Sequence, residues 1–316
     1  MNSRSTRRVI PSAIAHVTTI MNLTRIVSLV AVLAINWISQ AEPIPNDYRV
    51  GGFAIGCQAY SFNRFTVFEA IEKTEQTGSK TIEFYPGQAL SPERRTVKWD
   101  HNADDALIGD VQAKLKKHGI RAVNYGVVGI PKDETAARKI FDFARKMGMY
   151  GVTTESLDSL DVAEKLAKEY DLRVCIHEHA KRMKKDANGQ SVEDTSYKVW
   201  NPAYVAEIVK NRDPRIGACA DIGHWQTSGI RAIDGLKMLR GRVLSLHMKD
   251  RAGLGHGQHD AIFGTGQADI GGVLAELKAQ GFDGNISIEY EYNWDNSVPD
   301  IAQCVGFVRG WVANNR

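Results

Sequence analysis

The sequence has 316 residues and a formal net charge of +3 at pH 7. Its first 41 residues hold four arginines and no acidic residue, so the other 275 carry a net charge of −1 (+3 minus 4). The excess of basic residues therefore belongs to the N-terminal segment. The net positive charge of the whole sequence is for this reason no argument for nucleic-acid binding. A remainder of 275 residues suits one α/β barrel domain, which has about 250 residues.

The N-terminal segment has the pattern of an export signal, with translation starting at Met1 or Met21. Arg25 precedes an apolar run at 26–38, and Ser39-Gln40-Ala41 follows as a small-x-small cleavage site. The run is shorter than the roughly 20 residues that span a bilayer. We expect a periplasmic or secreted protein without a stable membrane span; an uncleaved anchor or a transit segment is the alternative. The predicted parts are a signal or targeting segment, a linker and one domain, at 1–41, 42–50 and 51–316.

Eight short runs in the remainder are predicted to form β-strands. Several are rich in Val, Ile and Ala without strict alternation, as is typical of parallel strands covered on both faces. The predicted strands lie at 53–60, 81–85, 120–128, 150–156, 172–179, 216–223, 242–250 and 285–291.

Amphipathic stretches separate these strands, and a further one closes the chain. The stretch at 103–119 starts with acidic residues and ends in Lys-Lys-His-Gly, which matches the helix dipole and the preference for glycine after a helix. The predicted helices lie at 66–78, 103–119, 135–148, 161–171, 201–211, 232–241, 270–281 and 299–312. Eight strands with eight helices favour a (β/α)₈ TIM barrel, an α/β fold. An open doubly wound sheet is the alternative, which the lack of a Gly-rich phosphate fingerprint after the first strand weakens.

Two long connections follow the fifth and seventh predicted strands, at 181–200 and 251–269. In a barrel both lie at the C-terminal face, where TIM-barrel sites are found. We expect them to form a lid or substrate walls; ordinary surface loops are the alternative.

Four of the predicted strands end in residues that bind divalent metals. The strands read VCIHEH, CADIGHW, LSLHMKD and ISIEYE, and the residues singled out are Glu178, Asp221, His247 and Glu289. Two glutamates, an aspartate and a histidine make a hard site for one divalent ion, such as Mn²⁺, Mg²⁺, Co²⁺ or Zn²⁺. They converge only if the fold brings four strand ends together. Each alone is also plausible as a salt-bridge partner.

Side-chain alternation along a strand predicts which of these residues share a face. Glu178 shares a face with Ile176 and Val174, whereas His177 and His179 have the opposite parity. We therefore expect Glu178 to face the site. Either one of these two histidines orients a ligand, or both face the helices.

Five motifs resemble a known family: IEFYPG, IHEH, DIGH, LHMKD and the tail GTGQADIGGVLAELKAQGFDGNISIEYE. On these motifs the chain resembles the xylose isomerase-like barrel family of sugar isomerases and epimerases, including ketose 3-epimerases and inosose-processing enzymes. The resemblance covers 50–312. It implies metal binding by the four residues above and substrate contact by His224. In the epimerase branch the two metal-bound glutamates exchange protons with the substrate carbon, which here implies Glu178 and Glu289 as the catalytic pair.

The implied chemistry is physically consistent. Removing a proton beside a carbonyl produces an enediolate, whose charge a chelated divalent cation stabilises. A carboxylate on each face lets one glutamate remove a proton and the other return it. Glu178 acting as the sole base, with Glu289 only a ligand, favours 1,2-isomerisation instead.

Further residues near strand ends are candidates for substrate binding. Glu155 is a substrate contact, a support for a ligand or a salt-bridge partner. Glu83 resembles the strand-two glutamate of the family, which implies a hydrogen-bond partner for sugar hydroxyls. Lys249 shares the parity of His247 and is expected to contact the substrate. Tyr60 and Trp225 are candidates for a sugar-stacking wall, with burial in the core as the alternative.

The sequence thus predicts a metal-dependent isomerase or epimerase for a small carbohydrate, with no nucleic-acid partner and with a homo-oligomer left open. The first alternative is a lyase or dehydratase for a keto-sugar, keto-inositol or 3-keto-glycoside. The second is a metal-dependent phosphodiesterase like the endonuclease branch of these barrels. The net charge of −1 argues against this alternative, because binding of a nucleic acid favours a basic groove. The third is a sugar-binding barrel without catalysis.

Overall fold

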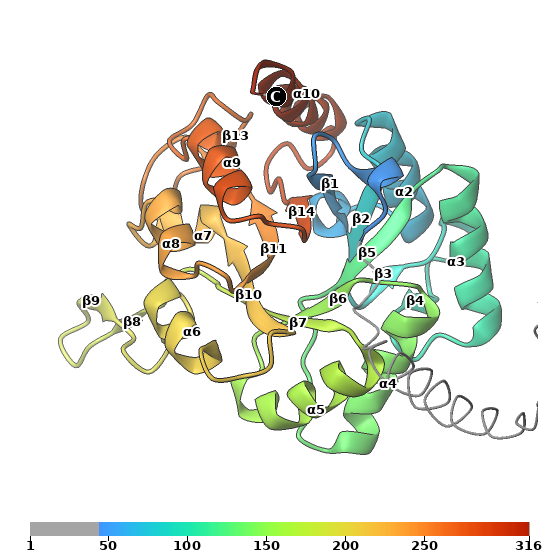
Figure 1. Ribbon diagram of the computed structural model, residues 1–316, viewed down its shortest axis with the longest axis horizontal. Coiled ribbons are helices and arrows are strands. Elements are labelled where there is room, and N and C mark those ends of the chain that lie inside the picture. Colours follow the sequence, from blue (N-terminus) through green and yellow to red (C-terminus); the bar gives the residue numbers. More distant parts are fainter. Residues whose placement is uncertain (1–43, 316) are drawn as a thin grey trace, which may run out of the picture. The chain divides into compact units, whose positions relative to one another are not determined.

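A computed structural model describes residues 44–315. Eight parallel strands close into a barrel in the order β1-β14-β11-β10-β7-β6-β5-β2, and helices surround it (Figure 1). The barrel strands are β1 (Ala54–Gln58), β2 (Thr81–Phe84), β5 (Arg121–Tyr125), β6 (Gly151–Thr154), β7 (Arg173–His177), β10 (Ile216–Asp221), β11 (Val243–Met248) and β14 (Asn285–Ile288). Each lies within one predicted strand, so the predicted TIM barrel is confirmed.

Eight helices match the predicted ones. They are α2 (Val67–Gln76), α3 (Asp105–Lys117), α4 (Glu134–Lys146), α5 (Leu160–Tyr170), α6 (Pro202–Val209), α8 (Ala232–Met238), α9 (Ile270–Ala279) and α10 (Val298–Asn314). Local signals set their ends: Thr66 and Glu69 form a capping box at the start of α2. Gly119 follows α3 with a φ of 63°, a conformation that glycine adopts without a steric penalty.

One short helix was not predicted. The strand predicted at 216–223 ends at Asp221, where α7 (Ile222–Thr227) begins. The Asp221 side chain accepts a hydrogen bond from the backbone N–H of His224 at 2.8 Å and so caps this helix. The cap uses Oδ1 of Asp221 and leaves its other oxygen, Oδ2, for the barrel mouth.

The two sides of the barrel wall differ in chemistry. Toward the helices, strand residues such as Val174 and Ile176 belong to a large apolar cluster with helix residues such as Val205. Inside the barrel, buried polar side chains bond to one another, including Glu83 and Thr153 at 2.8 Å. The interior is therefore a polar layer beneath the C-terminal ends of the strands.

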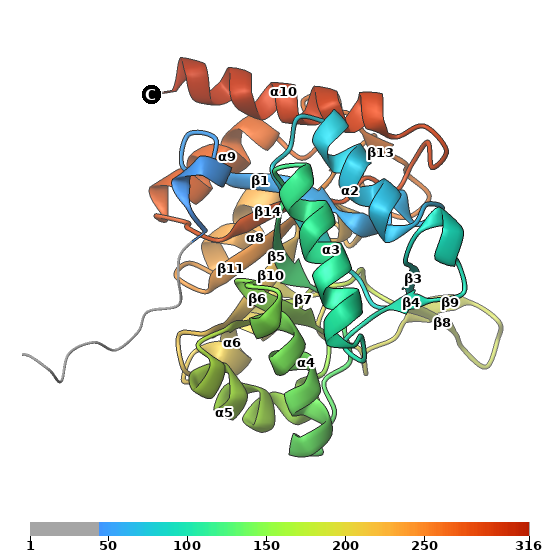
Figure 2. The ribbon, with the colours of Figure 1, turned by 90° about the vertical axis from the view of Figure 1, so that its right-hand side faces the viewer.

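Both predicted long connections contain a small hairpin. Residues 181–200 form β8 (Met183–Lys185) and β9 (Ser191–Glu193), and the connection after β11 forms β12 (Asp250–Arg251) and β13 (Asp260–Ala261). A third hairpin, β3 (Gln88–Ala89) with β4 (Lys98–Trp99), follows β2. The β3–β4 and β8–β9 hairpins lie on the same side of the barrel in Figure 2, as expected for loops at the C-terminal face.

The described chain begins inside the predicted linker. Ile44 is buried against Ala54, Val123 and Tyr150, so this segment already packs on the barrel from residue 44. The predicted signal segment at 1–41 lies outside the described residues. Within 44–315, no helix has the length and apolar character needed to cross a membrane.

Short 3₁₀ turns complete the fold at η1 (Asn46–Tyr48), η2 (Ala59–Phe62), η3 (Pro92–Arg94) and η4 (Leu157–Ser159).

Candidate metal centre

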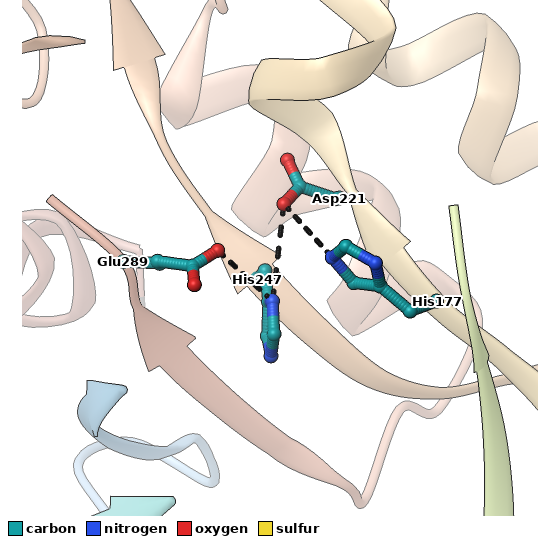
Figure 3. Close-up of side chains that lie close together, drawn as sticks. All are labelled: His177, Asp221, His247 and Glu289. Carbon is teal, nitrogen blue, oxygen red and sulfur yellow. Dashed lines mark ion pairs between the residues drawn. The ribbon is translucent and has the colours of Figure 1, made fainter. Parts of the chain in front are cut away.

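Four side chains from neighbouring strands meet at the C-terminal end of the barrel (Figure 3). They are His177, Asp221, His247 and Glu289, all buried, and each offers one ligand atom within 4.8 Å of the others. Oδ2 of Asp221 lies 3.4 Å from Nε2 of His177 and 3.8 Å from Nδ1 of His247. The same Nδ1 lies 3.1 Å from Oε2 of Glu289. Three of the four residues predicted from strand ends therefore meet as expected.

The register of the parallel strands explains the convergence. Asp221 on β10 is paired with His247 on β11, and His247 with Ser287 on β14. Partners in a parallel sheet point to the same face, and Glu289, two residues beyond Ser287, points there too. The inward parity predicted for His247 and Glu289 is thus met.

The fourth member is His177 and not Glu178. Register decides this point, because His177 is paired with Cys219, which has the parity of Asp221 two residues later. Glu178 therefore follows Val174 and Ile176, which pack in the apolar cluster toward the helices. Glu178 is fully buried and lies outside the group of four, so the expectation that it faces the ion is not met.

The burial of Glu178 has an electrostatic consequence. Its two carboxylate oxygens make no hydrogen bond of good geometry, and the side chain of Trp225 is the neighbouring donor. Desolvation, followed by the nearby charge of Asp221, raises the pKa of Glu178 well above its ordinary value. A neutral carboxyl at this place is consistent with a residue behind the site rather than in it.

Each histidine of the group has a carboxylate on its other ring nitrogen. Nδ1 of His177 lies 3.0 Å from Glu155, which directs Nε2 toward the centre. Nε2 of His247 lies 3.2 Å from Glu83, an ion-pair contact without hydrogen-bond geometry, and Nδ1 of His247 faces the centre. Carboxylates placed in this way orient metal-binding histidines and fix their tautomers. The predicted supporting role of Glu155 agrees with this contact.

The predicted contact of Glu83 with sugar hydroxyls is not supported. Glu83 is fully buried inside the barrel, where its carboxylate accepts hydrogen bonds from Thr153 at 2.8 Å and Ser287 at 2.6 Å. It lies below His247 rather than in the pocket described next. We therefore assign Glu83 to the support of His247.

A pocket of about 330 Å³ opens above the four residues, and His177 and Glu289 belong to its lining. Of the predicted substrate-binding residues, Tyr60, Glu155 and His224 line it as well. Tyr60 is 41% exposed and packs edge-on against Tyr85, with ring centroids 5.2 Å apart. This part of the predicted aromatic wall is present.

Trp225 does not belong to that wall. It lies on α7 with no exposed surface and packs in the apolar core, where its ring leaves no space for a side chain at Gly235. The alternative of a core residue therefore holds. The connection at 181–200, one of the two predicted lids, contributes indirectly. Its residues Tyr197 and Arg182 approach Glu155 at 3.4 and 3.7 Å, and neither lines the pocket.

Several other lining residues were not predicted to lie in the pocket, and His179 and Glu291 are the two with chemically active side chains beside the group of four. The His179 ring lies 4.2 Å from that of His224, centroid to centroid, and Glu291 lies two residues beyond Glu289. The signal for Glu291 was present, because it shares the parity of Glu289.

Lys249 lies at the centre itself, and not in the pocket lining as its predicted substrate contact requires. Its side chain is fully buried, and Nζ lies 3.2 Å from Oδ2 of Asp221 and 2.7 Å from Oε2 of Glu289. Burial alone would lower the pKa of Lys249, but Asp221, Glu289 and Glu291 raise it well above its ordinary value. Lys249 is therefore an ammonium at neutral pH.

The two carboxylates of the group are ionised. Burial opposes this, yet His224 and Lys249 lower the pKa of Asp221 well below its usual range. Lys249 and His247 likewise lower the pKa of Glu289. Metal binding requires deprotonated ligands, so both carboxylates are in the competent form at neutral pH.

The residues present fit a divalent ion. Nε2 of His177, Nδ1 of His247 and Oδ2 of Asp221 are buried and make no hydrogen bond of good geometry, although charged neighbours surround them. Buried polar atoms without such partners point to a missing ligand. Two imidazole nitrogens with two carboxylate oxygens suit Mn²⁺, Co²⁺ or Zn²⁺ better than Mg²⁺, which prefers oxygen ligands.

Comparisons with known proteins agree with this architecture. The model of the xylose isomerase-like TIM barrel family matches residues 71–309, and no curated protein sequence matches the chain. Among solved structures, an uncharacterised protein from Parabacteroides distasonis is 30% identical, with 82% of this chain and 99% of that one covered and a TM-score of 0.64.

Two structures of lower identity share the fold. A D-tagatose 3-epimerase-like protein is 15% identical, with 82% of this chain and 97% of that one covered and a TM-score of 0.61. The 3-keto-D-glucoside 4-epimerase of E. coli is also 15% identical, with 82% and 99% covered and a TM-score of 0.58. The family match confirms the resemblance found in the motifs: this chain belongs to the xylose isomerase-like TIM barrel family.

Proposed function

We propose that this protein is a divalent-metal-dependent isomerase or epimerase that acts on a keto-sugar by removing a proton from a carbon beside a carbonyl. The observation that carries the proposal is the group His177, Asp221, His247 and Glu289 at a pocket, with a carboxylate behind each histidine. Structural neighbours whose names include tagatose and 3-ketoglucoside epimerases support the choice of substrate class.

The four residues are proposed to hold the ion, with Mn²⁺, Co²⁺ or Zn²⁺ preferred on donor chemistry. A bound ion of this kind polarises a carbonyl and stabilises the negative charge of an enediolate. Glu289 is the proposed base, because it is ionised and lines the pocket. Tyr60 and His224 are proposed to contact the substrate from the pocket wall.

The position of Glu178 bears on the type of reaction. An exchange of protons between two metal-bound glutamates needs Glu178 in the pocket, and Glu178 is absent from the pocket lining. A base on one face alone is sufficient for 1,2-isomerisation, or for a lyase that expels a group from the neighbouring carbon. This observation disfavours epimerisation by Glu178 and Glu289 as a pair, and it leaves a lyase for a keto-sugar, keto-inositol or 3-keto-glycoside as the second candidate function beside 1,2-isomerisation.

The test is to incubate the Mn²⁺-loaded protein with a panel of keto-sugars and 3-keto-glycosides in D₂O. Deuterium at one carbon identifies the proton removed, and the product separates the candidates: an isomer or epimer supports the first, and release of water or an aglycone supports the lyase. Glu289→Gln should abolish exchange, while Glu178→Gln serves as the matched control. Hydrolysis of phosphodiesters without any exchange would contradict both.

Export is a separate part of the proposal. It rests on the apolar run at 26–38 and the Ser39-Gln40-Ala41 pattern. N-terminal sequencing of the protein recovered from its native host should start after Ala41. A chain that retains the segment would contradict cleavage.

A further inference from the structure

Lys249 is a buried cation that contacts the same oxygens that face the proposed ion. Its Nζ contacts Oδ2 of Asp221 and Oε2 of Glu289, at 3.2 and 2.7 Å. These are also the oxygens nearest to the two histidines of the group. A divalent ion held by the group of four would therefore share two carboxylates with the ammonium.

The fold holds this lysine in place. A side chain at Gly223 would lie within 2.6 Å of Cβ and 2.7 Å of Cδ of Lys249, so the first turn of α7 accommodates the lysine stem only because residue 223 has no Cβ. The lysine side chain has no exposed surface. It cannot leave the centre for solvent without a rearrangement of α7 or β11.

Lys249 has a third carboxylate partner outside the group of four. Nζ donates a hydrogen bond to Glu291 at 2.6 Å. The backbone N–H of Glu291 donates to Asp260 at 2.7 Å, and Asp260 in turn pairs with Arg251 at 3.1 Å. Glu291 is thus fixed beside the lysine by the connection that follows β11, while 32% of its side chain is exposed.

The charges present determine which carboxylates neutralise Lys249 with and without an ion. Without an ion, two ionised carboxylates face each other in a buried place, and Lys249 compensates both of them while His247 lies beside Glu289. With a divalent ion between them, the ion and the ammonium repel each other strongly, because the effective dielectric constant of a buried site is low. Glu291 is the partner that can then neutralise Lys249.

We propose that Lys249 is a positioning residue that holds Asp221 and Glu289 together in the ion-free protein and is retained by Glu291 when the ion binds. Lys249 then opposes binding of the ion, and Glu291 relieves that opposition. This inference rests on the proposed function only in that the centre takes a divalent ion.

The test measures ion affinity, independently of turnover. The full chain is stripped with a chelator and titrated with Mn²⁺ by calorimetry, at neutral pH. Lys249→Met should bind Mn²⁺ at least about tenfold more tightly than wild type, and Glu291→Gln at least about tenfold more weakly. In the Lys249→Met background, Glu291→Gln should have little effect, because no ammonium remains to be neutralised. Lys181→Met, which removes a lysine paired with Glu193 instead, is the matched control and should bind as wild type does.

Thermal unfolding of the ion-free proteins provides a second measurement. Lys249→Met should unfold at a lower temperature than wild type without the ion, and gain more stability from Mn²⁺. Unchanged or weaker binding by Lys249→Met overturns the inference. So does an unchanged affinity in Glu291→Gln, a partly exposed position whose variant should fold. A wild-type protein that binds no divalent ion overturns the proposed function together with this inference, whereas binding without these differences overturns this inference alone.

Discussion

The two halves of the barrel contribute different things to the site. The adjacent strands β7, β10, β11 and β14 and the residues at their ends supply all four side chains of the group. The other half, β1, β2, β5 and β6, supplies none of them, yet it provides both carboxylates behind the histidines, Glu83 on β2 and Glu155 after β6. Ligands and their supports therefore come from opposite halves of one closed sheet, and an intact barrel is needed to join them.

The supports themselves differ in exposure. Glu83 has no exposed side-chain surface, whereas 26% of the Glu155 side chain is exposed at the pocket. A buried polar network has no water to replace a lost partner, but a partly exposed one has. The two halves can be compared by weakening each in turn.

Removing a ligand from the first half should have the largest effect. Asp221→Asn keeps the oxygen that caps α7 but loses the charge, so the fold should persist while the ion is lost. We expect no stoichiometric Mn²⁺ binding at concentrations that saturate wild type, and no detectable turnover. Calorimetry and metal analysis would measure this, with circular dichroism to verify folding. Full metal occupancy in Asp221→Asn would show that the ion binds elsewhere.

Removing a support from the second half should have an intermediate effect that differs between the two glutamates. Loss of a carboxylate behind a metal-binding histidine costs about 10–100-fold in metal affinity. We expect Glu83→Gln near the upper end of this range, because Glu83 also accepts from Thr153 and Ser287 inside the barrel. Glu155→Gln should lie near the lower end. Equal Kd values for Mn²⁺ in the two variants would refute the role given to burial.

The smallest effect on ion binding is expected for Glu178→Gln, although Glu178 directly follows His177 in the sequence. Because burial raises its pKa, folded protein keeps a proton that the unfolded chain releases, so Glu178 lowers stability as pH rises above the ordinary carboxyl pKa. Glutamine cannot ionise. The free energy of unfolding of Glu178→Gln should therefore equal that of wild type at roughly pH 4 and be larger than that of wild type at roughly pH 8.

Urea unfolding at the two pH values would measure that difference, alongside Mn²⁺ titration. Glu178→Asn shortens the side chain and is the control for packing: it should lose stability at both pH values. Loss of Mn²⁺ binding in Glu178→Gln would return Glu178 to the ligand set.

Much of the fold was predictable because its signals are local. Acidic starts, glycine ends and short Val- and Ile-rich runs located the eight barrel strands and eight of the helices. Helix α7 was missed because its six residues were assigned to a strand and to the loop after it. Asp221, His247 and Glu289 were found for a similar reason, since each is the polar residue at the end of an apolar run. Trp225 was misplaced because an aromatic residue after a strand faces either the pocket or the core, and helix α7 turned it into the core.

The sequence by itself determined that this chain forms a TIM barrel whose last four strands end in side chains of the kinds that bind divalent metals. Only the tertiary structure decided that the IHEH motif contributes His177 rather than Glu178, because side-chain direction at a strand end depends on the register with the neighbouring strand, and one residue reverses it. It also decided that Lys249 lies among the carboxylates and that Glu83 lies beneath His247. These contacts join strands far apart in the sequence, so no local pattern encodes them.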